Sequence, residues 1–129
     1  MSWRSKKQSV VARSSAEAEF RSMAHGVCEL LWLRTMLDEL GYPVREPMKL
    51  YCDNKAAISI AHNPVQHDRT KHVEVDRHFI KEKLNLGLIC TPYVSTHDQV
   101  ADVLTKGVNK ISLQTMLCKL GMLDIFVPA

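Results

Sequence analysis

Three acidic residues stand where helices and strands are expected to begin or end, and acids at such places can hold hard cations. Asp53 follows the apolar run "LYC" and directly precedes a helical pattern that starts at Asn54. Glu19 lies in the first turns of a long helical pattern, and Asp102 lies near the start of a short one. Magnesium prefers a few carboxylates together with waters and substrate phosphate. A shared cation site would explain all three positions at once.

Each acid also has a simpler explanation. Asp53 or Asn54 can cap the helix that follows, because their side-chain oxygens accept hydrogen bonds from the free amides of its first turn. Asp102 can be an ordinary first-turn acid that interacts favourably with the helix dipole. For these two residues the residue pattern leaves both explanations open.

Glu19 is expected on the apolar face of the long helix. An α-helix returns to nearly the same azimuth after 4, 11 and 18 residues, which from Glu19 leads to Met23, Leu30 and Leu37. The same count from Glu17 gives a more polar line. A charge on a core-facing stripe is costly unless it is paired. The alternative is that Glu19 sits at the margin of the stripe and reaches solvent.

Histidines and cysteines offer a rival metal chemistry. His72, Asp76 and His78 lie in one expected helix, but a zinc pair on a helix face requires a spacing of about four residues rather than the six found. Solvated or hydrogen-bonded helix residues are the default explanation. The four cysteines are widely spaced within apolar segments, which indicates buried free thiols rather than a zinc motif or a disulfide framework.

The elements that must position these residues alternate between strands and helices. Strands are expected at 3–12, 48–53 and 88–94, and helices from the Ser14/Ser15 cap to Leu40, at 54–62, at 72–85, within "THDQVADVLTKG" and at 109–120. Glycines 41, 87 and 121 follow three of these helices. This alternation favours an α/β fold, with a sheet covered by helices.

Composition favours a soluble globular chain with one domain over residues 1–129. The chain is 46% hydrophobic and 24% charged, and no apolar run is long enough to cross a bilayer. Without a signal-peptide core, a cytoplasmic or nuclear location and no membrane partner are expected. The net charge is +3, and the first sixteen residues hold Arg4, Lys6, Lys7 and Arg13 without an acid. This basic arm suits phosphate binding, although solvated surface residues would look the same.

Several long motifs in order carry a resemblance to a known family. They are "SSAEAEF", "LYCDN", "AAISIAHNPVQHDRTKHVEVDRHFI" and "QVADVLTK", and the likeness runs nearly end to end. The chain resembles the ribonuclease H domain of copia-type retrotransposon polyproteins. That resemblance implies hydrolysis of the RNA strand of an RNA/DNA hybrid, with two Mg²⁺ (or Mn²⁺) ions about 4 Å apart. It also implies the reverse transcriptase portion of the polyprotein as a partner.

The resemblance assigns roles by position. Glu19, Asp53 and Asp102 match three of the family's four metal-binding, catalytic carboxylates, and Asn54 joins the basic arm as a nucleic-acid contact. The fourth acid belongs to the first strand of a mixed sheet of order 3-2-1-4-5, and this chain matches only strands 3, 4 and 5. The expected fold is therefore a ribonuclease H-like sheet with flanking helices that lacks two strands.

Two expectations follow from that shortfall. Alone, this polypeptide should fold poorly or expose the edge of the 48–53 strand, and it should cleave hybrid only at background level. The alternative functions are a non-catalytic nucleic-acid-binding remnant, which would use the basic arm, and a non-functional remnant of a retrotransposon.

Overall fold

The computed structural model describes residues 12, 14–63 and 71–122, which fall into two compact units. The first, here the N-terminal unit, runs to Val94, and the second, the C-terminal unit, contains the described residues from Ser95 onward. Each is considered by itself. The predicted strand at 3–12 lies outside the described residues except for Ala12.

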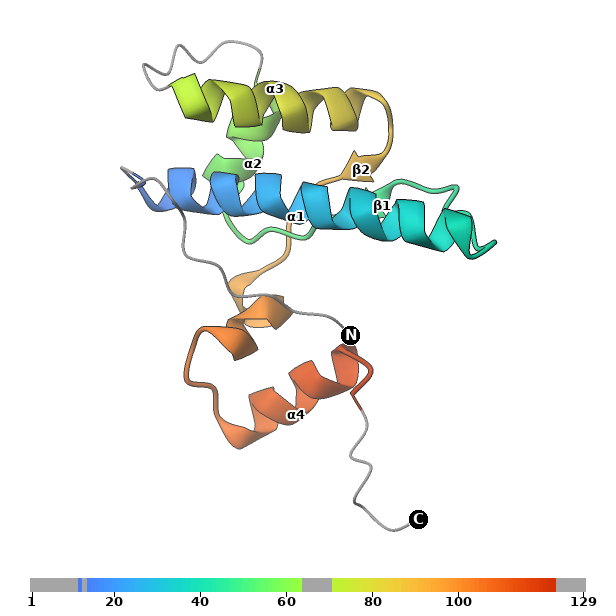
Figure 1. The fold of residues 1–129 in the computed structure, drawn as a ribbon. Helices are drawn as coiled ribbons and strands as arrows, with labels where there is room; N and C mark the ends of the chain where they lie inside the picture. The colour runs from blue at the N-terminus through green and yellow to red at the C-terminus, as the bar shows by residue number, and fades with distance from the viewer. Residues whose placement is uncertain (1–11, 13, 64–70, 123–129) are drawn as a thin grey trace. The chain divides into compact units, whose positions relative to one another are not determined.

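Helix α1 (Ser15–Glu39) is the longest element of the N-terminal unit (Figure 1). It begins where the sequence predicts, because the Ser14 hydroxyl accepts a hydrogen bond from the Glu17 amide at 3.1 Å. It ends at Glu39, and two residues later Gly41, with φ +82°, lets the Tyr42 amide turn back and donate to the Leu37 carbonyl at 2.8 Å. No helix in the described part of the chain is both long and apolar enough to cross a membrane.

A short parallel sheet forms beside α1. Strand β1 (Met48–Lys49) pairs with β2 (Ile89–Cys90), and an isolated bridge continues the same register from Cys52 to Tyr93. The amides of Met48, Leu50 and Cys52 donate to carbonyls of the second segment at 3.0, 2.9 and 3.3 Å. The pairing thus covers most of the predicted 48–53 and 88–94 strands, although regular strand geometry is confined to two residues in each.

Helices α2 (Lys55–His62) and α3 (Lys71–Asn85) complete the N-terminal unit and pack with α1 and with each other (Figure 1). Both were predicted within one residue of their observed ends. Gly87 follows α3 with φ +65° and turns the chain toward β2. The core combines one stripe of α1 with residues of every other element: Phe20, Met23, Ala24, Val27, Cys52, Ala57, Ala61, Val73, Ile80 and Ile89.

This mixture of four α-helices and a two-stranded parallel sheet within the described residues is consistent with the predicted α/β class. The two strands lie side by side in this sheet. The prediction for the cysteines is correct in one respect and wrong in another. All four are free thiols, but Cys28 and Cys118 are exposed rather than buried, since they lie on the outer faces of helices.

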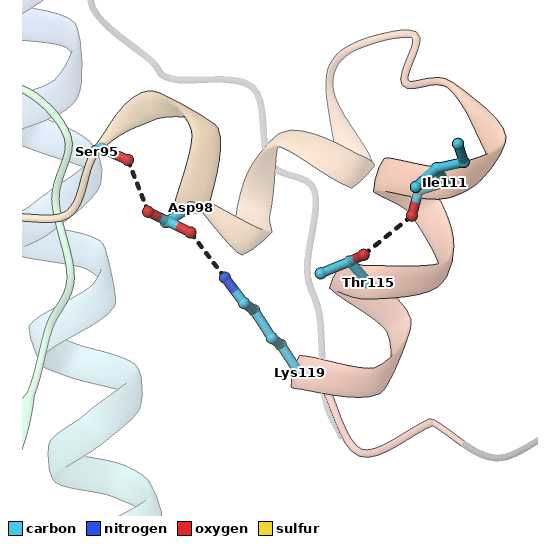
Figure 2. Close-up of polar contacts among 5 residues, drawn as sticks. All are labelled: Ser95, Asp98, Ile111, Thr115 and Lys119. Carbon is cyan, nitrogen blue, oxygen red and sulfur yellow. Dashed lines mark hydrogen bonds and ion pairs between the residues drawn. The ribbon is translucent and has the colours of Figure 1, made fainter.

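In the C-terminal unit, two short 3₁₀ helices, η1 (Thr96–Asp98) and η2 (Val100–Leu104), precede α4 (Lys110–Lys119). A hydrogen-bonded clasp joins η1 to the end of α4. The Asp98 carboxylate accepts a bond from the Ser95 hydroxyl at 2.8 Å and forms an ion pair with the Lys119 ammonium at 2.9 Å (Figure 2). Both interactions stabilise the charged carboxylate, so they lower the pKa of Asp98 below its ordinary value of 3.8.

The Asp98 clasp predicts an acid-sensitive contact. Because the folded-state pKa of Asp98 is depressed, its stabilising contribution is complete above pH 3.8 and is lost as the pH falls through the lowered value. Lys119→Met should raise the pKa of Asp98 toward 3.8, as followed by the carboxyl carbon shift in an NMR pH titration. Lys110→Met, at the other end of α4, is the control. An unchanged Asp98 pKa in the Lys119 variant would show that the clasp is absent in solution.

Candidate carboxylate site

Asp53 lies at the carboxyl end of the first strand segment, as predicted. Cys52, immediately before it, is fixed on both sides of its backbone. Its amide donates to the Pro92 carbonyl at 3.3 Å, and its carbonyl accepts from the Val94 amide at 3.1 Å. The Cys52 side chain is only 3% exposed, whereas Asp53 is half-buried. The strand pairing therefore holds the backbone at the point from which the Asp53 carboxylate projects.

Asn54, and not Asp53, caps α2. The Asn54 side-chain oxygen accepts a hydrogen bond from the Ala57 amide at 3.1 Å, and Asn54 has extended backbone angles at the cap position. This decides between the two capping residues that the sequence left open. Asp53 is not the N-cap of α2, so helix capping does not account for an acid at this position.

The prediction that Glu19 lies on the apolar face of α1 is wrong. Glu19 is exposed, and the buried stripe runs instead through Phe20, Met23, Ala24 and Val27. Each residue advances about 100° around a helix, so every step of four drifts by about 40°. The line from Glu19 through Met23 therefore follows the edge of the stripe and not its centre. The alternative stated for this residue, a position at the stripe's margin with access to solvent, is the one observed.

Glu19 and Asp53 nevertheless both influence the pKa of one group, the thiol of Cys52. Burial raises the pKa of Cys52 above its ordinary value of 9.0, and the hydrogen bond with the Asn54 backbone opposes that rise. The negative charges of Glu19 and Asp53 raise the Cys52 pKa further. Two carboxylates from different elements, one on α1 and one after β1, are thus close enough to influence one sulfur electrostatically. We call this pair the Cys52 corner.

Asp102 belongs to the C-terminal unit. It was predicted near the start of a short helix and lies in η2, which is a 3₁₀ helix. Its side chain is 14% exposed and forms an ion pair with the Lys106 ammonium at 2.8 Å. Sequence reasoning missed this partner, although an acid four residues before a lysine is a recognisable helical pairing signal.

Carboxylate oxygens are the donor type that suits Mg²⁺, so the chemistry of Glu19, Asp53 and Asp102 fits a hard cation. Across the residues that the structure describes, however, no group of three or more acidic, histidine or cysteine side chains is assembled to hold a metal ion. The Cys52 corner provides two carboxylates. The predicted basic arm, Arg4, Lys6, Lys7 and Arg13, lies outside the described residues.

His78, which was considered as a zinc ligand, has an ordinary partner on its own helix. His78 lies 4.0 Å from the Glu74 carboxylate, one turn earlier on α3, and both side chains are exposed. Asp76 pairs instead with the buried Arg21 of α1 at 3.8 Å. The exposed His78 agrees with the default explanation of solvated helix residues, whereas Asp76 bridges α3 to α1.

Polar and aromatic side chains make contacts at both ends of α2. The Lys55 ammonium, at the start of α2, lies 4.7 Å from the centre of the half-exposed Tyr93 ring. His62, at the other end of α2, is hydrogen-bonded to the Thr91 hydroxyl at 2.8 Å. Lys55 therefore brings a cation to the strand end that carries Asp53, a contact that the sequence pattern did not reveal.

Comparison with known proteins places these residues in a wider context. The chain is 44% identical over 97% of its length to the Retrovirus-related Pol polyprotein from transposon RE2 of Arabidopsis thaliana. It is 44% identical over 95% to the corresponding protein from transposon RE1 of the same plant, and 38% identical over 92% to that from transposon TNT 1-94 of Nicotiana tabacum. No family model and no solved structure matches the chain.

These relatives are homologues of the chain over most of its length. It spans 9%, 8% and 9% of the three relatives. The similarity therefore supports a chain that corresponds to one segment of a retrotransposon Pol polyprotein.

The free energy of unfolding tests the assignment of Asn54, and not Asp53, as the cap of α2. Asn54→Ala removes the cap of α2 and should lower the free energy of unfolding by about 0.5–2 kcal/mol. Asp53→Asn, which keeps the size of the side chain and leaves the cap in place, should change it by less than about 0.5 kcal/mol. Urea denaturation followed by circular dichroism measures both. A larger loss for Asp53→Asn than for Asn54→Ala would reverse the assignment.

Proposed function

We propose that this chain is a ribonuclease H-like segment of a retrotransposon polyprotein. The activity of that family is hydrolysis of the RNA strand of an RNA/DNA hybrid, and this polypeptide by itself should cleave hybrid only at background level. The Cys52 corner is the observation that carries the proposal. Two carboxylates from separate elements act on one thiol at the carboxyl end of a paired strand, and the nearby helix cap is provided by another residue. The homology to Retrovirus-related Pol polyproteins from transposons supports the same proposal.

Within this proposal, Glu19, Asp53 and Asp102 are the residues of this chain that would hold Mg²⁺. When bound, the metal ions would supply an activated water and stabilise the leaving oxygen of the RNA strand. The chain's own contribution is positioning. Backbone pairing at Cys52 fixes Asp53, α1 carries Glu19, and Lys55 offers a cation for a substrate phosphate beside them.

In this proposal, a metal ion would replace Lys106 as the partner of the Asp102 carboxylate. The Lys106 ammonium forms an ion pair with one Asp102 oxygen, and the Lys106 side chain is 54% exposed, so this ion pair lies at the surface and not within a packed core. An exchange of Lys106 for a metal ion at that oxygen would keep the nearly buried Asp102 charge balanced.

Hydrolysis of a labelled RNA/DNA hybrid with Mg²⁺ tests the proposal. The assay uses this polypeptide and a longer one that also carries the upstream, acid-bearing strands expected of the family. The longer polypeptide should cut the RNA strand only, and Asp53→Asn, Glu19→Gln or Asp102→Asn should each slow cleavage on the order of 100-fold or more. Asp98→Asn, an acid already engaged by Lys119, is the matched control and should retain activity.

Two results would contradict the proposal. One is cleavage that survives Asp53→Asn, because another group would then carry the chemistry. The other is a longer polypeptide that binds hybrid without cutting it, which would favour the non-catalytic nucleic-acid-binding alternative.

A further inference from the structure

A hollow of about 500 Å³ lies at the carboxyl end of α1. Its lining comes from the last turns of that helix and from the segment that follows: Arg34, Thr35, Asp38, Pro43, Val44 and Arg45. Position 34 is fifteen residues beyond Glu19 on the same helix, or roughly 22 Å at 1.5 Å per residue. The hollow is therefore distinct from the Cys52 corner, and neither the sequence patterns nor the proposed catalytic residues account for it.

Two arginine side chains contribute to the lining of this hollow. Neither Arg34 nor Arg45 forms an ion pair with a carboxylate in the described ranges, although both line the same space. Guanidinium groups bind phosphate oxygens through two parallel hydrogen bonds and remain charged at all physiological pH values. The pair favours an anionic ligand with phosphate chemistry.

Asp38 narrows the class of ligand. Its side chain lines the same hollow, and an ionised carboxylate can only accept hydrogen bonds, so it repels a bare anion but pairs with a hydroxyl donor. A ligand with a phosphate and a neighbouring hydroxyl satisfies both halves of the lining, and a ribonucleotide has both. A deoxyribonucleotide within a DNA strand lacks the 2′-hydroxyl. Pro43 and Val44 add an apolar wall suited to the sugar or base.

We propose that the hollow at the end of α1 binds a ribonucleotide unit, with its phosphate on Arg34 and Arg45 and its ribose hydroxyl on Asp38. The choice of an RNA strand as the source rests on the proposed function. The binding chemistry does not, since it also accommodates a free ribonucleoside monophosphate. On an RNA strand, this site would hold the substrate roughly 22 Å from Glu19, measured along the helix.

Binding without cleavage provides the test. The full chain, in EDTA, is titrated into a labelled RNA strand and a DNA strand of the same sequence, and a ribonucleoside monophosphate is added as a competitor. Arg34→Gln with Arg45→Gln should weaken RNA binding about tenfold or more. Lys81→Gln with Lys110→Gln removes the same charge from α3 and α4 and should weaken it no more than about twofold. Asp38→Asn should reduce the preference for RNA over DNA.

The outcomes separate cleanly. Competition by the monophosphate identifies free nucleotide as a ligand, whereas binding of the strand alone identifies RNA. Equal losses in the two double variants, an equal loss for DNA, equally strong binding of polyglutamate, or no RNA binding by the parent chain would each overturn the proposal. If the glutamine variant does not fold, Arg34→Lys with Arg45→Lys keeps the charge but loses the paired hydrogen bonds and should still weaken binding. Because EDTA removes divalent cations, the binding assay does not depend on metal-dependent cleavage, and its failure is distinguishable from failure of the cleavage assay.

Discussion

The parallel pairing of 48–52 with 89–93 is the constraint on which the N-terminal unit depends. It links two segments separated by α2 and α3, and it allows the Cys52 side chain to enter the core while the next residue emerges half-buried. Gly26 of α1 permits a close approach, because a Cβ atom at that position would lie 3.0 Å from the Leu50 side chain. The helix that carries Glu19 and the strand end that carries Asp53 are thereby packed against each other.

Ionisation of the buried Cys52 thiol is costly, because burial and two nearby negative charges oppose it. Burial and the two negative charges raise the pKa of Cys52, so the thiol stays protonated and unreactive at neutral pH. Cys52 thus serves as a small apolar residue that fills the core below the corner. Cys28 and Cys118, by contrast, are exposed.

The helix ends were predictable from sequence because local interactions define them. The features that depend on tertiary contacts were not predictable in this way. Ser14 as a cap and the glycines after α1, α3 and α4 act within a few residues, so sequence alone located these ends. The face of α1 that carries Glu19 depended on where the core lies, and the error came from a drift of about 40° per four residues. Similarly, the segment around Asp102 has helical spacing in sequence but forms two 3₁₀ helices.

The residues of the candidate sites likewise fall into those that were recognisable from sequence and those that only the fold brings together. Asp53 and Asp102 were recognisable from their places beside regular elements, and the resemblance to a known family predicted a common role for them. The sequence pattern did not single out Arg34 and Arg45, because one belongs to a helix and the other to the segment after it. The turn at Gly41 brings both to one hollow. Lys55 beside Tyr93 likewise depends on the strand pairing, which joins residues far apart in sequence.

The central claim is that Glu19 and Asp53 share one cation-binding corner beside Cys52. Paramagnetic broadening of backbone amide signals by Mn²⁺ tests it most directly, because the effect is local and requires no catalysis. The account predicts selective broadening around Glu19 and around Cys52 and Asp53 together, which Asp53→Asn removes at both places. Broadening that remains around Glu19 in that variant, or that never includes Cys52, would contradict it.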